Sequence, residues 1–259
     1  MHSVAHSDAS PSVHVQSITL DHPWRWLAAG WADLTARPAL SLGYGAVFAA
    51  VGFLLLFGLE AVGAGYLILP MGMGFALIAP LAAVGLYEAS RRRQRGDADM
   101  TFADVLGAWR RNPGQMALVG AFLLIAFLAW VRLAMLEFML FFGAAPPPLD
   151  DLLGALLLSP QSLAFLLVGL VSGGVIAAGV FAMIAIAVPM LLDRSETDAM
   201  TAMLTSVRAV RRNWRPMLLW AGLIGSATVL GMALYFVGLV VVLPLLGHAS
   251  WHAYRDLVE

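Results

Sequence analysis

Cysteine and lysine are both absent from this sequence of 259 residues. Without cysteine the chain cannot form disulfides, and it cannot hold zinc or iron–sulfur centres through thiolates. Charge is also scarce, because only 12% of the residues are charged and 61% are hydrophobic. A soluble domain usually carries about a quarter charged residues. The composition therefore favours a membrane protein over a soluble domain.

Uncharged stretches long enough to cross a membrane recur along the chain. A helix needs about 20 residues to cross a hydrocarbon core of roughly 30 Å. The uncharged stretches cover residues 38–59, 61–87, 152–192 and 217–254, and a further stretch, 114–143, is interrupted only by Arg132 and Glu137. The last stretch is too long for one span and fits two helices with a tight turn. Pro160 divides 152–192 into a short surface segment and one helix. We therefore predict an all-α, polytopic membrane protein with six transmembrane helices.

The distribution of arginine predicts the orientation of these helices. If six helices cross the membrane, fourteen of the fifteen arginines lie in segments on one side, and Arg132 lies within the third helix. Because basic residues concentrate on the cytoplasmic side of membrane proteins, we expect both termini in the cytoplasm. Residues 1–20 are polar and have no basic region followed by an apolar run, so we expect a disordered cytoplasmic tail rather than a signal peptide.

Three similar segments precede the first, third and fifth predicted helices. Residues 31–45, 107–120 and 208–222 each contain an amphipathic stretch, an arginine shortly before a proline, and a glycine six or seven residues further on. Proline suits the first turn of a helix, where its missing N–H costs nothing. We predict one transmembrane domain over residues 21–259. It consists of three hairpin units, at about 21–95, 100–194 and 198–259, each preceded by a cytoplasmic interfacial amphipathic helix.

Four blocks of the sequence resemble a known family. The blocks are PWRWLAAGWADL, GLYEASRRRQRGD, VPMLLDR and PLLGHASWHAYRDLV. They resemble the signature blocks of a bacterial integral-membrane family, domain of unknown function 2189 (DUF2189). The resemblance implies a bacterial inner-membrane protein, and it implies no activity.

Two histidines near the C-terminus form the first candidate site. His248 and His252 are four residues apart, so both side chains leave a helix on one face and can share a metal ion. If the ends of the first and third hairpins correspond, Glu88 takes the place of His252 and adds a carboxylate. The alternative is a plain membrane boundary, since Trp251 and Tyr254 are typical of an aromatic belt. The sequence favours the boundary over the metal site.

Charges within the predicted spans form a second candidate site. Arg132 is costly inside a membrane, so an intramembrane charge of this kind is a functional hypothesis by default. Glu137 is five residues further on, roughly 140° around the helix, which makes it a poor partner within the helix. Glu60, at the outer end of the first helix, can pair with Arg132 from elsewhere in the fold. The charges indicate either a structural ion pair or a path for a solute.

Clustered arginines at the predicted cytoplasmic surface form the third candidate site. Such clusters attract anionic lipid headgroups, although topology alone also explains them. The residues with this expected role are Arg91, Arg92, Arg93, Arg110, Arg111, Arg211 and Arg212.

The sequence contains no catalytic motif and leaves little room for a soluble catalytic domain between the helices. We therefore expect a non-enzymatic accessory, assembly or scaffold protein for a membrane complex, without a cofactor and without a nucleic-acid partner. The expected partners are the lipid bilayer and another membrane protein complex, and the oligomeric state stays open. A small-solute or ion permease is the first alternative, and a metal-handling membrane protein is the second.

Overall fold

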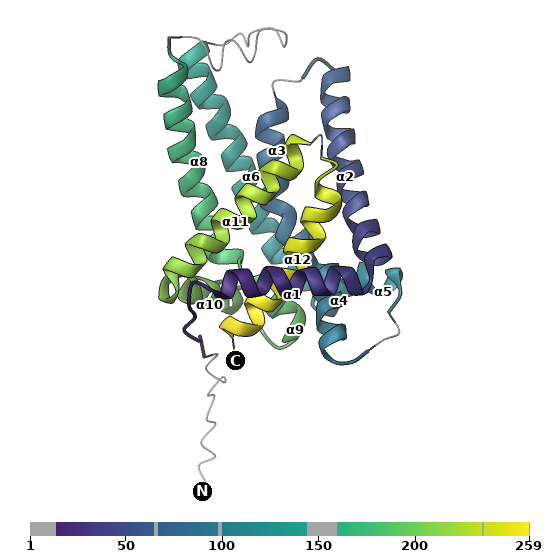
Figure 1. Cartoon of the computed structure of the whole chain (residues 1–259). Coiled ribbons are helices and arrows are strands. Elements are labelled where there is room, and N and C mark those ends of the chain that lie inside the picture. The colour runs from purple at the N-terminus through teal and green to yellow at the C-terminus, as the bar shows by residue number, and fades with distance from the viewer. Residues whose placement is uncertain (1–13, 65–66, 98–99, 144–159, 235, 259) are drawn as a thin grey trace, which may run out of the picture.

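The computed structural model describes residues 14–64, 67–97, 100–143, 160–234 and 236–258 (Figure 1). In this part of the chain all regular secondary structure is helical. The helices are α1 His22–Ala36, α2 Pro38–Ala61, α3 Ile68–Ala82, α4 Val84–Gln94, α5 Phe102–Leu106, the 3-10 helix η2 Ala108–Arg111, α6 Pro113–Phe142, α8 Ser162–Ile184, α9 Ala187–Asp193, α10 Ala199–Arg212, α11 Trp214–Ala233 and α12 Leu239–Leu257. The surface segment predicted around residues 152–159 lies outside the described residues.

Four helical stretches are long and apolar enough to cross a membrane. They are Pro38–Ala61, Pro113–Phe142, Ser162–Asp193 and Trp214–Ala233, with mean hydropathies of 2.1, 2.3, 2.6 and 1.5. The all-α, polytopic membrane class is therefore confirmed. The predicted second and sixth spans correspond to α3 and α12, which are not among these four stretches. Helix α3 has only 15 residues, and the second half of α12 carries polar side chains. The six-span topology stays a prediction.

The helices begin where local chemistry favours it. Pro38 and Pro113 occupy the first turns of α2 and α6, where a missing N–H costs no hydrogen bond. The residues before them have nearly the same backbone conformation, with φ/ψ of −140°/68° at Arg37 and −145°/63° at Asn112. The chain therefore enters α2 and α6 through turns of similar backbone conformation.

Amphipathic elements lie across the ends of the spans. Helix α1 lies across the lower end of the bundle, at a steep angle to α2, and α10 lies at the same level (Figure 1). We call this end of the molecule the base. Helix α1 precedes α2, and α10 precedes α11. In the same position before α6 there are two short helices, α5 and η2, of five and four residues. Thr101 and Asp104 form a capping box that starts α5, and Asp198 caps α10.

Helix α12 is the central packing element of the base. It lies against α1, α2 and α4, and two glycines on its neighbours permit the close approach. A Cβ added at Gly30 of α1 would lie 2.8 Å from the backbone nitrogen of Ala249, and one at Gly45 of α2 would lie 2.2 Å from the carbonyl oxygen of Val240. Helix α2 therefore packs mainly on α12, although α3 follows it in the sequence.

Both described ends of the chain meet at the base (Figure 1). Val15 and Val258 form an isolated antiparallel bridge, and the N–H of Gln16 donates to the carbonyl of Leu257 at 3.0 Å. The side chain of Asn213 accepts from the N–H of Ile18 at 2.9 Å. Residues 1–13 of the predicted disordered tail lie outside the described residues. Residues 15–18, which the same prediction includes, are instead held in place by these contacts.

Candidate functional site

Asp33 is the centre of a buried polar network at the base. It lies on α1, is 8% exposed, and accepts hydrogen bonds from three residues, two on α4 and one on α12. The Nη1 of Arg93 donates to Oδ1 at 2.7 Å, while the hydroxyl of Ser90 and the Nε2 of His252 both donate to Oδ2, the latter at 2.9 Å. Burial by itself raises the pKa of Asp33, but the hydrogen bonds from His252 and Ser90 outweigh it and hold the pKa below its usual value. The carboxylate is therefore ionised, and both of its oxygens accept hydrogen bonds.

The proton positions around His248 follow from this arrangement. Since the only hydroxyl hydrogen of Ser90 points to Asp33, the oxygen of Ser90 accepts from Nδ1–H of His248, at 2.8 Å. The Nε2 of His248 then carries the lone pair and accepts from the hydroxyl of Ser41, at 3.0 Å. His248 is 2% exposed and lies outside the four candidate spans, and burial lowers its pKa to about 4. The imidazole is thus neutral near pH 7.

The second histidine is oriented by a glutamine. The Oε1 of Gln94 accepts from the indole of Trp251 at 2.9 Å, so its amide nitrogen faces the Nδ1 of His252, at 3.3 Å. His252 therefore accepts at Nδ1 and donates to Asp33 at Nε2. Protein groups use all four ring nitrogens of His248 and His252. Among the described residues, no group of three or more His, Asp or Glu side chains is arranged to hold a metal ion. The metal site stays a prediction.

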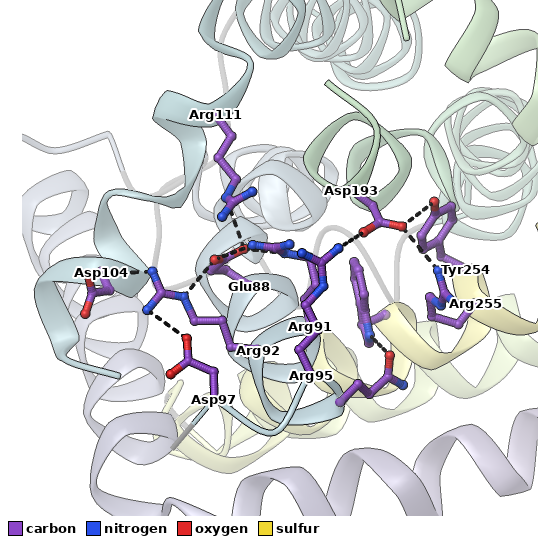
Figure 2. A network of polar contacts seen from close by, with 12 residues as sticks. Glu88, Arg91, Arg92, Arg95, Asp97, Asp104, Arg111, Asp193, Tyr254 and Arg255 are labelled. Atoms are coloured by element: carbon purple, nitrogen blue, oxygen red, sulfur yellow. Dashed lines mark hydrogen bonds and ion pairs between the residues drawn. The ribbon is translucent and has the colours of Figure 1, made fainter. Parts of the chain in front are cut away.

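Glu88 belongs to a different cluster, made of arginines (Figure 2). It lies on α4, is 1% exposed, and accepts two hydrogen bonds from Arg91 of the same helix, at 2.7 and 2.8 Å. Arg92 adds a bond at 2.9 Å, and Arg111 of η2 lies 3.5 Å away. Burial favours a higher pKa for Glu88, but the hydrogen bonds from Arg91 and Arg92 dominate and lower it. The carboxylate is the shared counter-ion of three guanidinium groups.

A second carboxylate, Asp193, connects α9 with its neighbours (Figure 2). It accepts from the hydroxyl of Tyr254 at 3.1 Å and lies 3.2 Å from Arg255, both on α12. Arg95, in the turn after α4, lies 3.4 Å from its other oxygen. The arginines and carboxylates of the base thus link α4 and its following turn to η2, and to α9 and α12.

The arginines expected at lipid headgroups differ in exposure. Arg91 is 3% exposed and is a structural ion-pair partner rather than a surface residue. Arg92 and Arg93 have side chains 22% and 46% exposed. The remaining members of the set are exposed, namely Arg110, Arg111, Arg211 and Arg212. Their contact with lipid stays a prediction.

The charges within the spans are not brought together in the described part of the chain. Arg132 is exposed on α6, and Glu60 is exposed in the last turn of α2. Glu137 is 6% exposed and faces α8, because a Cβ at Gly169 would lie 3.6 Å from its Oε2. No ion pair joins any two of these residues in the described ranges.

Several network residues were not identified from the sequence, chiefly Asp33, Ser41 and Ser90. One signal for Asp33 was present: it lies seven residues after Trp26 and three after Gly30, on the face of α1 that is buried. A carboxylate on the buried face of an interfacial helix needs partners from other elements. The serines carry no comparable signal, because small hydroxyl side chains are common in apolar helices.

A hydrogen-bonded base beneath four apolar helices defines the class of this protein, a polytopic integral membrane protein. The family described as "Predicted integral membrane protein (DUF2189)" matches residues 68–193. That segment, from α3 to the end of α9, belongs to the DUF2189 family, and the resemblance seen in the sequence is confirmed there. It includes Glu88 and its arginines, whereas Asp33 and both histidines lie outside it. No curated protein and no solved structure matches the chain.

Proposed function

We propose that the protein is a non-enzymatic accessory or scaffold protein of a bacterial inner-membrane complex. In this proposal the chain crosses the membrane six times in three hairpins, returning through α3 and through the apolar first half of α12, before His248. Both termini face the cytoplasm, where the arginine-rich base lies. The partner is another integral membrane protein that contacts the spans.

The uneven burial of the molecule carries this proposal. Only 22% of the residues in the most apolar windows of α2, α6 and α11 are buried. The base, in contrast, is tied together by buried hydrogen bonds and ion pairs around Asp33 and Glu88. A rigid base that holds apolar helices with broad uncovered faces is suited to presenting those faces to a partner within the bilayer.

Photo-crosslinking within the native membrane tests the proposal. A photoreactive residue is placed at Leu140 of α6 or Leu170 of α8, which are 74% and 73% exposed. The matched control is Leu123 of α6, which is fully buried. We expect one membrane protein to be captured at near-stoichiometric yield from an exposed position and not from Leu123. Crosslinks to lipid alone from both exposed positions would rule out the scaffold role.

One observation favours the permease as a second candidate. Glu137 is a buried carboxyl group within a spanning stretch, five residues before the end of α6, and such groups frequently mark solute or proton paths. A permease predicts that Glu137→Gln abolishes flux in vesicles while the folded amount is preserved. Arg132 lies on the same helix but is exposed. Loss of flux in Glu137→Gln alone would indicate a path through the α6–α8 contact, whereas loss of flux in Arg132→Gln would indicate a path along the exposed surface of α6.

Metal handling is the weaker alternative. It predicts bound metal in the purified protein that is lost in a His248→Ala, His252→Ala double variant. Because both lone-pair nitrogens already accept hydrogen bonds from the protein, a metal ion would have to displace Ser41 and Gln94.

A further inference from the structure

A cavity of about 260 Å³ opens at the base beside the polar network. It lies between α1, α2, α4 and α12, and part of its wall comes from the turn after α4. The polar lining residues are Asp33, Arg37, Ser41, Arg93, Asp97 and His248. The remaining wall is formed by small or apolar residues, among them Leu40 and Met100. The cavity therefore combines an apolar wall with charged groups.

Most polar groups of the wall are already satisfied by one another. Asp33 is balanced by Arg93 and accepts from Ser90 and His252, and the hydroxyl of Ser41 is bound to His248. The inner wall thus has no unbalanced charge to offer a ligand.

Arg37 is different from the other polar groups of the wall. Its Nη1 donates to the carbonyl of Met100 at 2.9 Å, and in the described ranges no carboxylate lies within ion-pair distance of its guanidinium. A guanidinium has five N–H donors, and its planar fork matches the oxygens of a phosphate. Among the residues that the structure describes, Arg37 is therefore the one positive charge of the cavity without a counter-ion.

The position of Arg37 limits where an anion would come from. It directly precedes Pro38, the first residue of a spanning stretch, so the cavity lies at the depth where the membrane begins. Asp97 also lines the cavity and is 43% exposed, with its only described ion pair a long one, 3.6 Å to Arg92. A second carboxylate nearby disfavours a doubly charged ligand and admits one with a single negative charge.

We propose that this cavity binds a phosphodiester group, as found in a membrane phospholipid headgroup, through the guanidinium of Arg37. The apolar wall around Leu40 and Met100 receives the glycerol end, and the exposed apolar face of α2 continues toward the acyl chains. The balanced pair Asp33–Arg93 and the neutral His248 form a wall that does not compete for the phosphate. This proposal does not depend on the scaffold role, and the two proposals are tested by separate experiments.

Native mass spectrometry of the full chain in detergent tests the site. Phosphatidylethanolamine and phosphatidylglycerol are titrated in turn, and the retained lipid is compared for the unchanged chain, Arg37→Gln and Arg25→Gln. Arg25 is the matched control, because it lies on α1, the helix that ends just before Arg37, but is 69% exposed, pairs with Asp21 and does not line the cavity. We expect about tenfold weaker retention in Arg37→Gln alone, the factor expected for one lost hydrogen bond to a charged group.

Two further arms complete the test. Arg37→Lys keeps the charge and should recover part of the binding, which a mere folding defect would not allow. Glycerophosphoethanolamine, which has the headgroup without acyl chains, distinguishes the source: binding as tight as that of the lipid would assign the site to a soluble phosphodiester. Equal retention by the unchanged chain, Arg37→Gln and Arg25→Gln would overturn the proposal.

Discussion

His248 on α12 and Ser90 on α4 are 158 residues apart in the sequence, and their side chains are joined by a hydrogen bond of 2.8 Å between Nδ1 and Oγ. Through Ser41 and Asp33 the same network extends to α2 and α1. Side chains of α2 and α4 therefore bond directly to an imidazole on α12, and α1 joins them through Ser90. The hydrogen bonds leave a single consistent arrangement of protons. Such buried networks stabilise a fold only while every member is satisfied.

The neutral state of His248 makes stability depend on pH. Its folded pKa of about 4 lies below the ordinary value of 6.5. The unfolded chain therefore binds a proton between these values while the folded chain does not, so stability falls as pH falls through this window. We expect a loss of about 3 kcal/mol between pH 7 and pH 4, measured by thermal unfolding in detergent.

His248→Gln is the control for this pH dependence. The variant is less stable at pH 7, but its stability should fall much less between pH 6.5 and pH 4. Asp33 does not interfere, because its lowered pKa places its own loss of stability below about pH 4. An unchanged slope in His248→Gln would assign the effect to other groups.

Removing the charge of Glu88 should be strongly destabilising. Glu88→Gln leaves the guanidinium of Arg91 buried, 3% exposed, without its counter-ion. Breaking a buried pair in this way costs about 3–5 kcal/mol. Chemical unfolding and folded yield measure the effect. Glu196→Gln, at an exposed carboxylate, should stay within about 0.5 kcal/mol of the unchanged chain, and a similar result for Glu88→Gln would contradict the buried pair.

Two glycines of the same helix should respond in opposite ways to alanine. Gly45→Ala places a Cβ 2.2 Å from the carbonyl of Val240, so α12 must move, at a cost of about 1–3 kcal/mol. Gly58→Ala meets nothing within 4 Å and should be neutral or stabilising, since alanine favours a helix by about 1 kcal/mol over glycine. Comparison of the two melting temperatures is the measurement. Equal effects would show that α2 does not contact α12 as described.

The absence of cysteine permits a clean crosslinking test of the two ends. Val15 and Val258 form an antiparallel bridge, and the Cα separation in such a pair suits a disulfide. The double variant Val15→Cys, Val258→Cys should form an intramolecular disulfide on mild oxidation, detected as a shift in gel mobility. Val15→Cys, Val237→Cys, with the second cysteine at the α11–α12 turn, should not. Crosslinking in both would disprove the pairing of the termini.

Much of the architecture could be predicted from the sequence because its signals are local. Hydropathy over about 20 residues indicated the spans at α2, α6, α8 and α11, and prolines indicated where α2 and α6 begin. Even the approach of Arg91 to Glu88 is local, because the two residues are three apart on one helix.

The tertiary structure alone decided the site. Glu88 and the histidines were expected together, but Glu88 is held by arginines and His252 is held by Asp33, 219 residues away. Asp33 and Ser41 became network members only because α1 and α2 approach α12 at Gly30 and Gly45. A buried polar group binds whatever partner the packing of helices places within about 3 Å. That packing is set by shape across distant segments, and no short stretch of sequence records it.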